Sequence, residues 1–270
     1  MPGRARDRAR TRRGITSRFL PIQLSGCALW LRADLGVTLN GSTVSAWANQ
    51  GTAGGSVTQG TAASQPTFSA TGGPNSQAGL SFDGGDWLTS DLAASAWAFL
   101  HSANSTVFVV WKTTSANPNA YFGMLSTASS GTNDRGFALF YDDRSGLSRN
   151  DRLIVNINNG GATVAGLLTG NNAFTAATWG VAETVYSYQD AGSDLIALVN
   201  GTSVGTSESA VATSASAPQG PLELGRLVSD TGSRLIGSIA EAIAFNRTLT
   251  AAERAQVRRY LSQRYAIAIA

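Results

Sequence analysis

Few residues in this sequence of 270 residues could perform acid–base or nucleophilic chemistry. His101 is the only histidine, which excludes a metal site with several histidine ligands and leaves one candidate base for a Ser-His-acid triad. Ser130 and Ser145 each precede a glycine but lack the G-x-S-x-G context of a nucleophile elbow. We therefore interpret His101 as a surface or loop-edge residue.

Carboxylates could act in pairs, because glycoside hydrolysis needs one on each side of the scissile bond. Glu183, Glu223 and Glu241 each stand alone among apolar or small neighbours in the sequence. With neither a triad nor a carboxylate pair, we expect that the protein is not an enzyme.

Aspartates near asparagines suggest a calcium site, because Ca²⁺ prefers carboxylate, amide and carbonyl oxygens. The candidate ligands are Asp83, Asp86, Asp134, Asp142 and Asp143. None of them forms a D-x-D-x-D-G loop, and Asp and Asn also serve turns. We favour the turn interpretation and expect no required cofactor, with Ca²⁺ kept as the alternative.

Aromatic side chains beside polar loops can serve as stacking platforms for sugars. The candidates for glycan binding are Trp87, Tyr121, Tyr141 and Trp179. Aromatic residues inside strands more often belong to the core, which is our interpretation of Trp30 and Trp111.

Positive charge is concentrated at the N-terminus. Residues 1–18 have a net charge of +6, which leaves −3 for the remainder of a chain whose net charge is +3. The arginines of this segment are Arg4, Arg6, Arg8, Arg10, Arg12, Arg13 and Arg18. A segment with so little apolar content should be disordered alone. It is either an anchoring arm for an acidic protein surface or nucleic acid, or a solvated tail.

Cys27 is the only cysteine, which excludes an internal disulfide. Residues 24–27, Leu-Ser-Gly-Cys, spell a bacterial lipobox, in which Cys27 would be lipidated after cleavage. The apolar stretch before it contains Pro21 and Gln23 and is short for a signal peptide. We favour Cys27 as a small buried residue at the edge of the first strand. No apolar run approaches the length needed to span a bilayer.

The C-terminal region predicts a buried strand over residues 235–245 followed by a helix. Thr250 and Glu253 form a capping box at the helix start. The residues spaced for one apolar face are Val257, Tyr260, Leu261 and Tyr265. The arginines that we expect mostly on the solvated faces are Arg254, Arg258, Arg259 and Arg264.

The rest of the sequence predicts many short strands separated by turns. We expect strands at 27–32, 42–48, 80–83, 87–89, 106–113, 121–125, 136–141, 152–157, 178–188, 195–200, 202–205 and 221–227. Residues 40–41 and 200–201, both Asn-Gly, predict hairpin turns. Residues 51–76 read as a loop with short extended pieces, and 91–100 as a helical turn or two.

The end of the chain resembles the last strand and helix of laminin-G-like and concanavalin A-like jelly-roll domains. The matching residues are Gly237, Ile239, Ala240, Glu241, Ile243, Phe245, Arg247, Leu249, Glu253, Arg254, Tyr260 and Leu261. The first strands of such domains are similar to residues 29–34, 44–47, 49–51, 65–67 and 80–84. The resemblance covers roughly residues 19–267. Glycanases of this fold carry E-x-D-x-x-E on one strand, and this sequence contains no such string.

The resemblance implies an all-β fold, a two-sheet antiparallel jelly-roll sandwich of the concanavalin A-like type. We expect a basic extended arm over residues 1–18 and one jelly-roll domain over 19–270, with one C-terminal amphipathic helix packed on the sandwich. The fold hosts lectins, glycanases, adhesins and viral surface proteins, so it does not by itself fix a function.

Domains of this pattern with a short N-terminal arm resemble bacteriophage virion components of the tail, fibre or head decoration. This implies a non-enzymatic structural or binding module on the virion, fastened to other virion proteins by its arm and contacting host surface glycans. A homo-oligomer would suit a particle component. The alternative is a secreted or lipid-anchored bacterial carbohydrate-binding module, located outside the cell or on its surface. Nucleic acid would be bound only through the arm.

Overall fold

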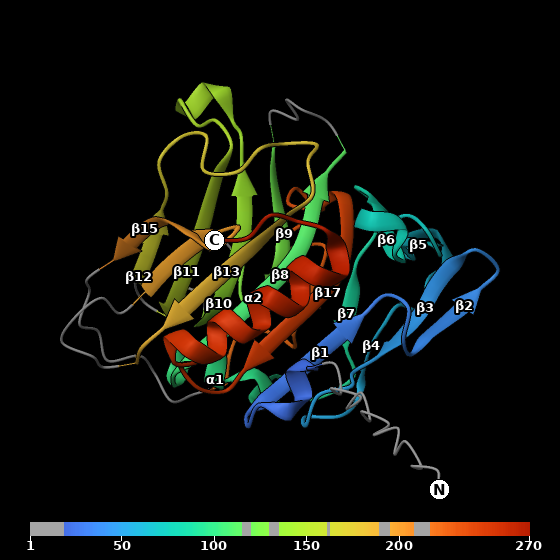
Figure 1. Cartoon of the computed structure of the whole chain (residues 1–270). Coiled ribbons are helices and arrows are strands. Elements are labelled where there is room, and N and C mark those ends of the chain that lie inside the picture. The colour runs from blue at the N-terminus through green and yellow to red at the C-terminus, as the bar shows by residue number, and fades with distance from the viewer. Residues whose placement is uncertain (1–18, 115–119, 130–134, 161–162, 189–194, 208–216) are drawn as a thin grey trace, which may run out of the picture.

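The computed structural model describes residues 19–114, 120–129, 135–160, 163–188, 195–207 and 217–270. In these ranges the chain is almost entirely antiparallel β-structure that ends in one long helix (Figure 1). The strands are β1 (Cys27–Arg32), β2 (Val37–Asn40), β3 (Thr43–Ala48), β4 (Ser56–Thr58), β5 (Thr67–Ser69), β6 (Gly79–Asp83), β7 (Leu88–Ser90), β8 (Ser105–Thr113), β9 (Tyr121–Ser126), β10 (Arg135–Asp142), β11 (Arg152–Asn159), β12 (Thr163–Leu168), β13 (Gly180–Tyr186), β14 (Leu195–Val199), β15 (Thr202–Ser207), β16 (Glu223–Leu224) and β17 (Ile236–Phe245).

Helical segments are short apart from the last. The α-helices are α1 (Phe99–Ser102) and α2 (Ala251–Tyr265), and the 3-10 helices are η1 (Pro21–Gln23), η2 (Ala62–Ser64), η3 (Pro74–Ser76), η4 (Ala94–Trp97) and η5 (Ser145–Leu147). No helix of the described residues is long and apolar enough to cross a membrane.

The strand pairings define two layers. In the first layer the order is β1, β17, β8, β13, β14 and β15. In the second layer it is β12, β11, β10, β9, β16, β7, β4, β3 and β2. Strand β5 pairs with β3, and β6 pairs with both β5 and β17, so the two layers are joined through these two strands. The predicted two-sheet antiparallel sandwich is confirmed.

Large side chains from both layers meet in the core between them. The indole of Trp111 on β8 lies 5.5 Å, centroid to centroid, from the ring of Tyr141 on β10 and 4.4 Å from that of Phe174. Phe122 on β9 stacks against Tyr141 at 6.2 Å. Because all four side chains are at most 3 % exposed, this aromatic cluster fixes how the layers face each other.

The middle strands of the first layer, β17, β8 and β13, are buried on both faces. Their outer face packs under α2, which Figure 1 shows lying across these strands. Phe108 and Val110 of β8 point to this outer side, whereas Val107 and Val109 belong to the core between the layers. Burial on both faces explains why residues 106–111, TVFVVW, show no alternation of polar and apolar residues.

Helix α2 begins where the sequence predicts. Thr250 is its N-cap: the Thr250 Oγ1 accepts from the Glu253 amide at 3.3 Å, and the Glu253 carboxylate accepts from the Thr250 amide at 2.9 Å. The four residues predicted for its apolar face, Val257, Tyr260, Leu261 and Tyr265, are all buried. The predicted helix face is therefore confirmed.

The prediction that the arginines of α2 are solvated is wrong for Arg254 and Arg258, which both bind Glu183 on β13. Arg258 donates to the Glu183 carboxylate at 2.7 and 3.1 Å, and Arg254 donates to it at 3.3 Å. Glu183 is fully buried, so its charge needs these partners. A glutamate that stands alone in the sequence thus binds two arginines of the helix.

Gly237, the first residue of the motif in β17, lies where no side chain fits. A Cβ atom there would lie 2.2 Å from the backbone oxygen of Lys112 on the paired strand β8. We expect Gly237→Ala to lower the free energy of unfolding by about 2 kcal/mol, because the strands must separate to relieve the overlap. Urea unfolding followed by tryptophan fluorescence measures this. Gly41→Ala is a poor control because φ is positive there, whereas Gly146→Ala meets no atom within 4 Å and should cost little.

The structure differs from the sequence prediction in several elements. Strands β2 and β12 were not predicted, and the strand predicted over 221–227 is limited to Glu223–Leu224. Short strands β4 and β5 do lie within the predicted loop of residues 51–76. His101 is fully buried in α1, so its prediction as a surface residue is wrong. His101 follows Leu100, whose side chain belongs to the core between the layers and so anchors this short helix there.

Candidate functional site

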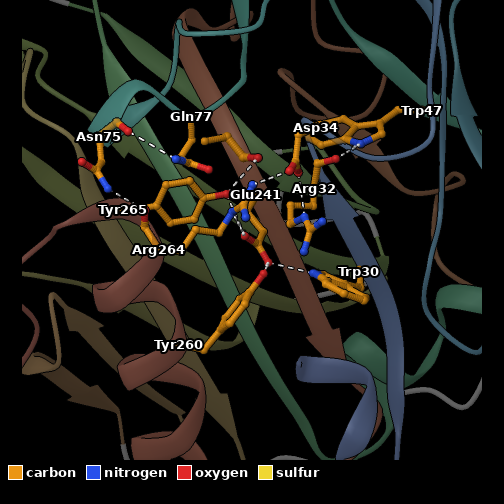
Figure 2. A network of polar contacts seen from close by, with 11 residues as sticks. Trp30, Arg32, Asp34, Trp47, Asn75, Gln77, Glu241, Tyr260, Arg264 and Tyr265 are labelled. Carbon is orange, nitrogen blue, oxygen red and sulfur yellow. Dashed lines mark hydrogen bonds and ion pairs between the residues drawn. The ribbon is translucent and has the colours of Figure 1, made fainter. Parts of the chain in front are cut away.

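The most extensive polar network in the described residues surrounds Glu241 of β17 (Figure 2). Its carboxylate accepts hydrogen bonds from the Trp30 indole at 2.7 Å, the Tyr260 hydroxyl at 2.9 Å and the Tyr265 hydroxyl at 2.7 Å. Arg264 lies 3.8 Å away. Burial raises the pKa of Glu241, although these hydrogen bonds oppose that shift. All three hydrogen-bond donors are buried side chains, so the network joins α2 to β1 and β17.

The network ends at the molecular surface in an ion pair. Arg264 donates to Asp34 at 2.7 Å, and Arg32 donates to the other oxygen of Asp34, also at 2.7 Å. The Asp34 side chain is 38 % exposed. Burial alone would raise the pKa of Asp34, but hydrogen bonds from Arg264 and Arg32 hold this pKa below its usual value. A third arginine of the helix is therefore paired.

Two of the four predicted glycan-binding aromatics are not available for stacking. Tyr141 is fully buried in the core and donates its hydroxyl hydrogen to Asp151. Trp87 is partly exposed, but the guanidinium groups of Arg226 and Arg234 lie over its ring at 4.1 and 4.5 Å from the centroid. These cation–π contacts occupy the surface that a sugar would need.

A hollow of ≈ 360 Å³ lies on the outer face of the second layer. Its apolar floor is a row across three paired strands: Phe140 on β10 faces Ile154 on β11, which faces Leu168 on β12. Leu168 is 45 % exposed, an unusual exposure for a large apolar side chain inside a strand. The remaining lining residues are Arg144, Arg149, Asn156 and Gly166.

The turn between β10 and β11 places two arginines at the edge of this hollow. Asp142 is fully buried and accepts from Arg144 at 2.9 and 2.6 Å and from Arg149. Burial tends to raise the pKa of Asp142, but hydrogen bonds from Arg144 and Arg149 outweigh it and lower the pKa. One carboxylate thus orients two guanidinium groups, and this group of three keeps a net positive charge.

Most N–H groups of Arg149 have no side-chain partner in the part of the chain that the structure describes. A guanidinium has five N–H donors, and only Nη1 of Arg149 is engaged by a side chain of the described residues. No sequence pattern predicted Arg144, Arg149 or Asn156 as site residues. The available sequence signal for this site is the pair of arginines, Arg144 and Arg149, in the turn that follows Asp142 and Asp143.

Tyr121 lies next to the hollow. The Arg144 guanidinium is 4.2 Å from its ring centroid, and Phe140 packs edge-on against it at 6.5 Å. Its hydroxyl donates to Asp230 at 2.9 Å. Of the four predicted aromatics, Tyr121 is the one that the structure places beside this hollow, where it supports Arg144.

Trp179 lies at a different place, just before β13 of the first layer. It packs against the residues buried under α2, and Lys112 Nζ lies 5.2 Å from its ring centroid. A second, shallower groove adjoins it. The predicted aromatics are therefore not brought together into one site.

The predicted metal ligands are also dispersed. Asp142 holds two arginines, Asp143 accepts from the Asp151 amide at 3.3 Å, and Asp134 lies outside the described residues. Within the described ranges no group of three or more His, Cys, Asp or Glu side chains could hold a metal ion. Calcium binding stays a prediction from the sequence.

Asp83 and Asp86 form a tight turn after β6. The Asp86 carboxylate accepts from the Asp83 amide at 3.0 Å, and Asp83 accepts from the Gly85 amide at 2.7 Å. Burial, together with the negative charge of Asp83, raises the pKa of Asp86 to about 6 against the opposing amide hydrogen bond. These aspartates therefore serve the turn, as the favoured interpretation predicts.

The raised pKa of Asp86 predicts a pH dependence of stability. Above pH 6 the buried carboxylate is charged and disfavours folding, and as the pH falls from about 6 toward 4 the native state takes up a proton first. We expect the free energy of unfolding of the wild type, relative to Asp86→Asn, to increase by about 1 to 2 kcal/mol between pH 7 and pH 4. Urea titrations of both proteins at the two pH values test this, and a constant difference would contradict it.

Two further predictions concern the N-terminal region. The seven arginines of the arm all lie outside the described residues. Cys27 begins β1, is fully buried, and its thiol pKa is raised to about 12 by burial, with a smaller contribution from Glu241. Its prediction as a small buried residue at the strand edge is confirmed.

Solved structures with the same fold belong to proteins of diverse kinds. A Trypanosoma rangeli sialidase in complex with the inhibitor DANA matches with a TM-score of 0.54 and 18% identity, over 90% of this chain and 34% of that chain. The same sialidase in complex with sialic acid matches with a TM-score of 0.52 and 14% identity, over 90% and 34% of the two chains. The botulinum neurotoxin type G receptor binding domain matches with a TM-score of 0.56 and 15% identity, over 88% of this chain and 52% of that one. No family model and no curated protein matches the sequence.

These matches contradict the prediction that the protein is not an enzyme, because the sialidases that share its fold over 90% of its length are enzymes. The chain spans about a third of the length of those sialidases, at an identity that shows the fold alone. What the comparisons establish for this chain is a β-sandwich of the jelly-roll kind.

Proposed function

We propose that this protein is a β-sandwich recognition module that binds glycans carrying a carboxylate through the hollow at Arg144 and Arg149. One observation carries the proposal: a hollow with an apolar floor is bordered by two arginines that a single buried carboxylate, Asp142, holds in place. The net charge of this group is positive, so it favours an anion over a neutral ligand.

The lining residues suit the two chemical faces of an acidic sugar. In the row of Phe140, Ile154 and Leu168, the exposed Leu168 offers an apolar surface to C–H groups, next to the buried Phe140 and Ile154. The Asn156 side chain, which also lines the hollow, can donate to and accept from hydroxyl groups. A guanidinium matches a carboxylate with two parallel hydrogen bonds. Arg149 has the unengaged N–H groups for such a pair.

The structural comparisons support this proposal at the level of the fold. The sialidase match includes a complex with sialic acid, a sugar that carries a carboxylate. The botulinum neurotoxin match is a receptor binding domain. The sialic acid and the receptor belong to those proteins, and the residues of the hollow are the argument for this chain.

Isothermal titration calorimetry of the wild-type protein with sialyllactose and with lactose tests the proposal. The two ligands differ by the acidic sugar, so we expect sialyllactose to bind and lactose to bind at least tenfold more weakly at this hollow. Binding of sialyllactose should weaken as salt is added, because partly exposed charges are screened. Equal affinity for both ligands, or no binding of sialyllactose and other carboxylate-bearing glycans, would refute the proposal.

A second candidate role is that of a bacteriophage virion component, fastened to its particle by the basic arm. The concentration of seven arginines in residues 1–18 favours it. Deletion of residues 1–18 should then abolish incorporation into the particle while sialyllactose binding persists. Unchanged incorporation would refute the anchoring role. The lipid-anchored alternative is less favoured, because Cys27 is fully buried in β1.

A further inference from the structure

A groove of ≈ 610 Å³ lies at the C-terminal end of α2, on the first layer rather than the second. Its lining residues are Pro74, Asn75, Ala177, Thr178, Trp179, Asn200, Tyr265, Ala266, Ile267 and Ala268. None of them has a charged side chain. This distinguishes the groove from the hollow at Arg144 and Arg149.

Trp179 forms the aromatic wall of the groove. It also lines a small cavity of ≈ 80 Å³, together with Thr178 and Asn200. The indole is partly exposed, and its base packs with the residues beneath α2. Lys112 Nζ lies over the ring, 5.2 Å from its centroid, so a ligand has to stack on the face that Lys112 leaves free. A ring fixed by packing loses little freedom when a ligand stacks on it.

Two asparagines in the groove offer opposite hydrogen-bonding groups. Asn200 Oδ1 accepts from the Val181 amide at 2.8 Å, which leaves the Asn200 Nδ2 without an acceptor among the described residues. Asn75 is oriented the other way, because its Nδ2 donates to the Arg264 carbonyl at 3.1 Å. Its Oδ1 then remains as an acceptor. The groove thus presents a fixed amide donor and a fixed amide acceptor.

The backbone around the groove is unusual as well. Of the nine described non-glycine residues with positive φ, four line it: Asn75, Ala177, Asn200 and Ala266. The left-handed conformation is unfavourable for alanine, since its Cβ crowds the following carbonyl. Residues in such conformations gather at binding sites, where the fold must hold a particular shape.

We infer that the groove at Trp179 is a second saccharide site, which takes a neutral sugar. The indole supplies a stacking surface for the C–H face of a pyranose, and the two amides supply the donor and the acceptor that a hydroxyl group needs. The absence of charged side chains from the lining residues favours a neutral ligand over an acidic one. This second site is independent of the proposed function, because it shares no residue with the hollow.

An array of neutral and sialylated oligosaccharides, probed with the wild type and two variants, tests the inference. Trp179→Ala removes the stacking surface. Ala268→Trp fills the groove from an exposed residue without removing a packed side chain, so it remains informative if the first variant fails to fold. We expect both variants to lose at least tenfold in binding of neutral oligosaccharides and to keep their binding of sialylated ones.

Two outcomes would overturn the inference: a wild type that binds no neutral oligosaccharide, or an Ala268→Trp variant that binds them as the wild type does. The sialylated members of the same array report on the hollow at Arg149. Failure of the proposed function would therefore appear as loss of those signals alone.

Discussion

Glu241→Ala should lower the free energy of unfolding by about 4 kcal/mol, the largest effect that we expect from a single substitution in this protein. The variant leaves three buried donors, on Trp30, Tyr260 and Tyr265, without their shared acceptor, and it removes a buried carboxylate that lies 3.8 Å from Arg264. Urea unfolding followed by tryptophan fluorescence measures the loss, and it should also appear as a fall of about 10 °C in Tm.

Two matched variants show whether the loss comes from the network. Glu241→Gln keeps one acceptor oxygen and should cost about half as much. Glu253→Ala removes a glutamate from the partly exposed helix cap, which should cost about 1 kcal/mol. A cost for Glu241→Ala no larger than that of Glu253→Ala would show that the buried network does not stabilise the fold.

Arg149→Ala should weaken the binding of sialyllactose about 100-fold, which corresponds to about 2.7 kcal/mol. Arg149 contributes the unengaged guanidinium donors at the hollow. Asp142 keeps both hydrogen bonds from Arg144 in this variant, so the turn between β10 and β11 should retain its structure. Calorimetry with sialyllactose measures the change in Kd, and the unfolding curve of the variant verifies that it is folded.

Arg259→Ala is the control for charge alone. Arg259 is exposed on α2, the helix that covers the first layer. It is not among the residues that line the hollow. Its removal changes the net charge by the same amount and should leave the Kd unchanged. Arg149→Lys keeps the charge but loses the bidentate geometry, so an intermediate affinity is expected. If Arg149→Ala binds sialyllactose as well as Arg259→Ala does, the ligand is bound elsewhere.

The two predictions concern the two layers, which have different roles. The middle strands of the first layer have a buried outer face, because α2 covers them and the carboxylates of Glu183 and Glu241 bind side chains of that helix. On the second layer the corresponding outer face carries the hollow, with Leu168 exposed. The helix covers one face, and the hollow proposed as a binding site lies on the other.

Local patterns were sufficient to predict the elements that obey local rules. Each of these features depends on successive residues no more than four positions apart. They are the Asn200-Gly201 hairpin, the capping box at Thr250 and the apolar face of α2. Strand β12 (Thr163–Leu168) was not predicted because it contains Gly166, which has a low strand propensity. It lies at the sheet edge, where its pairing with β11 and not the propensity of its residues defines the strand.

The candidate site was only partly predictable, because its residues depend on which face of a strand looks outward. Tyr121 and Tyr141 each lie at an end of an apolar segment of the sequence, yet Tyr141 points into the core and Tyr121 lies beside the hollow. A shift of one residue in register exchanges the two faces, and nothing near either tyrosine reveals that register. The arginines over Trp87 come from residues 226 and 234, far along the chain.

The sequence by itself determined the fold class, the strand-to-helix ending and the buried place of Cys27, since periodicity, turn residues and caps act over short distances. Only the tertiary structure decided which charges meet: Glu183 and Glu241 with α2, and Asp142 with the two arginines of the hollow. For Glu183 and Glu241 the partners are separated in sequence, and a buried carboxylate is tolerated only where the completed fold brings donors to it. Recognition at the hollow depends on the same packing, because the pairing of β10, β11 and β12 aligns Phe140, Ile154 and Leu168 into its floor.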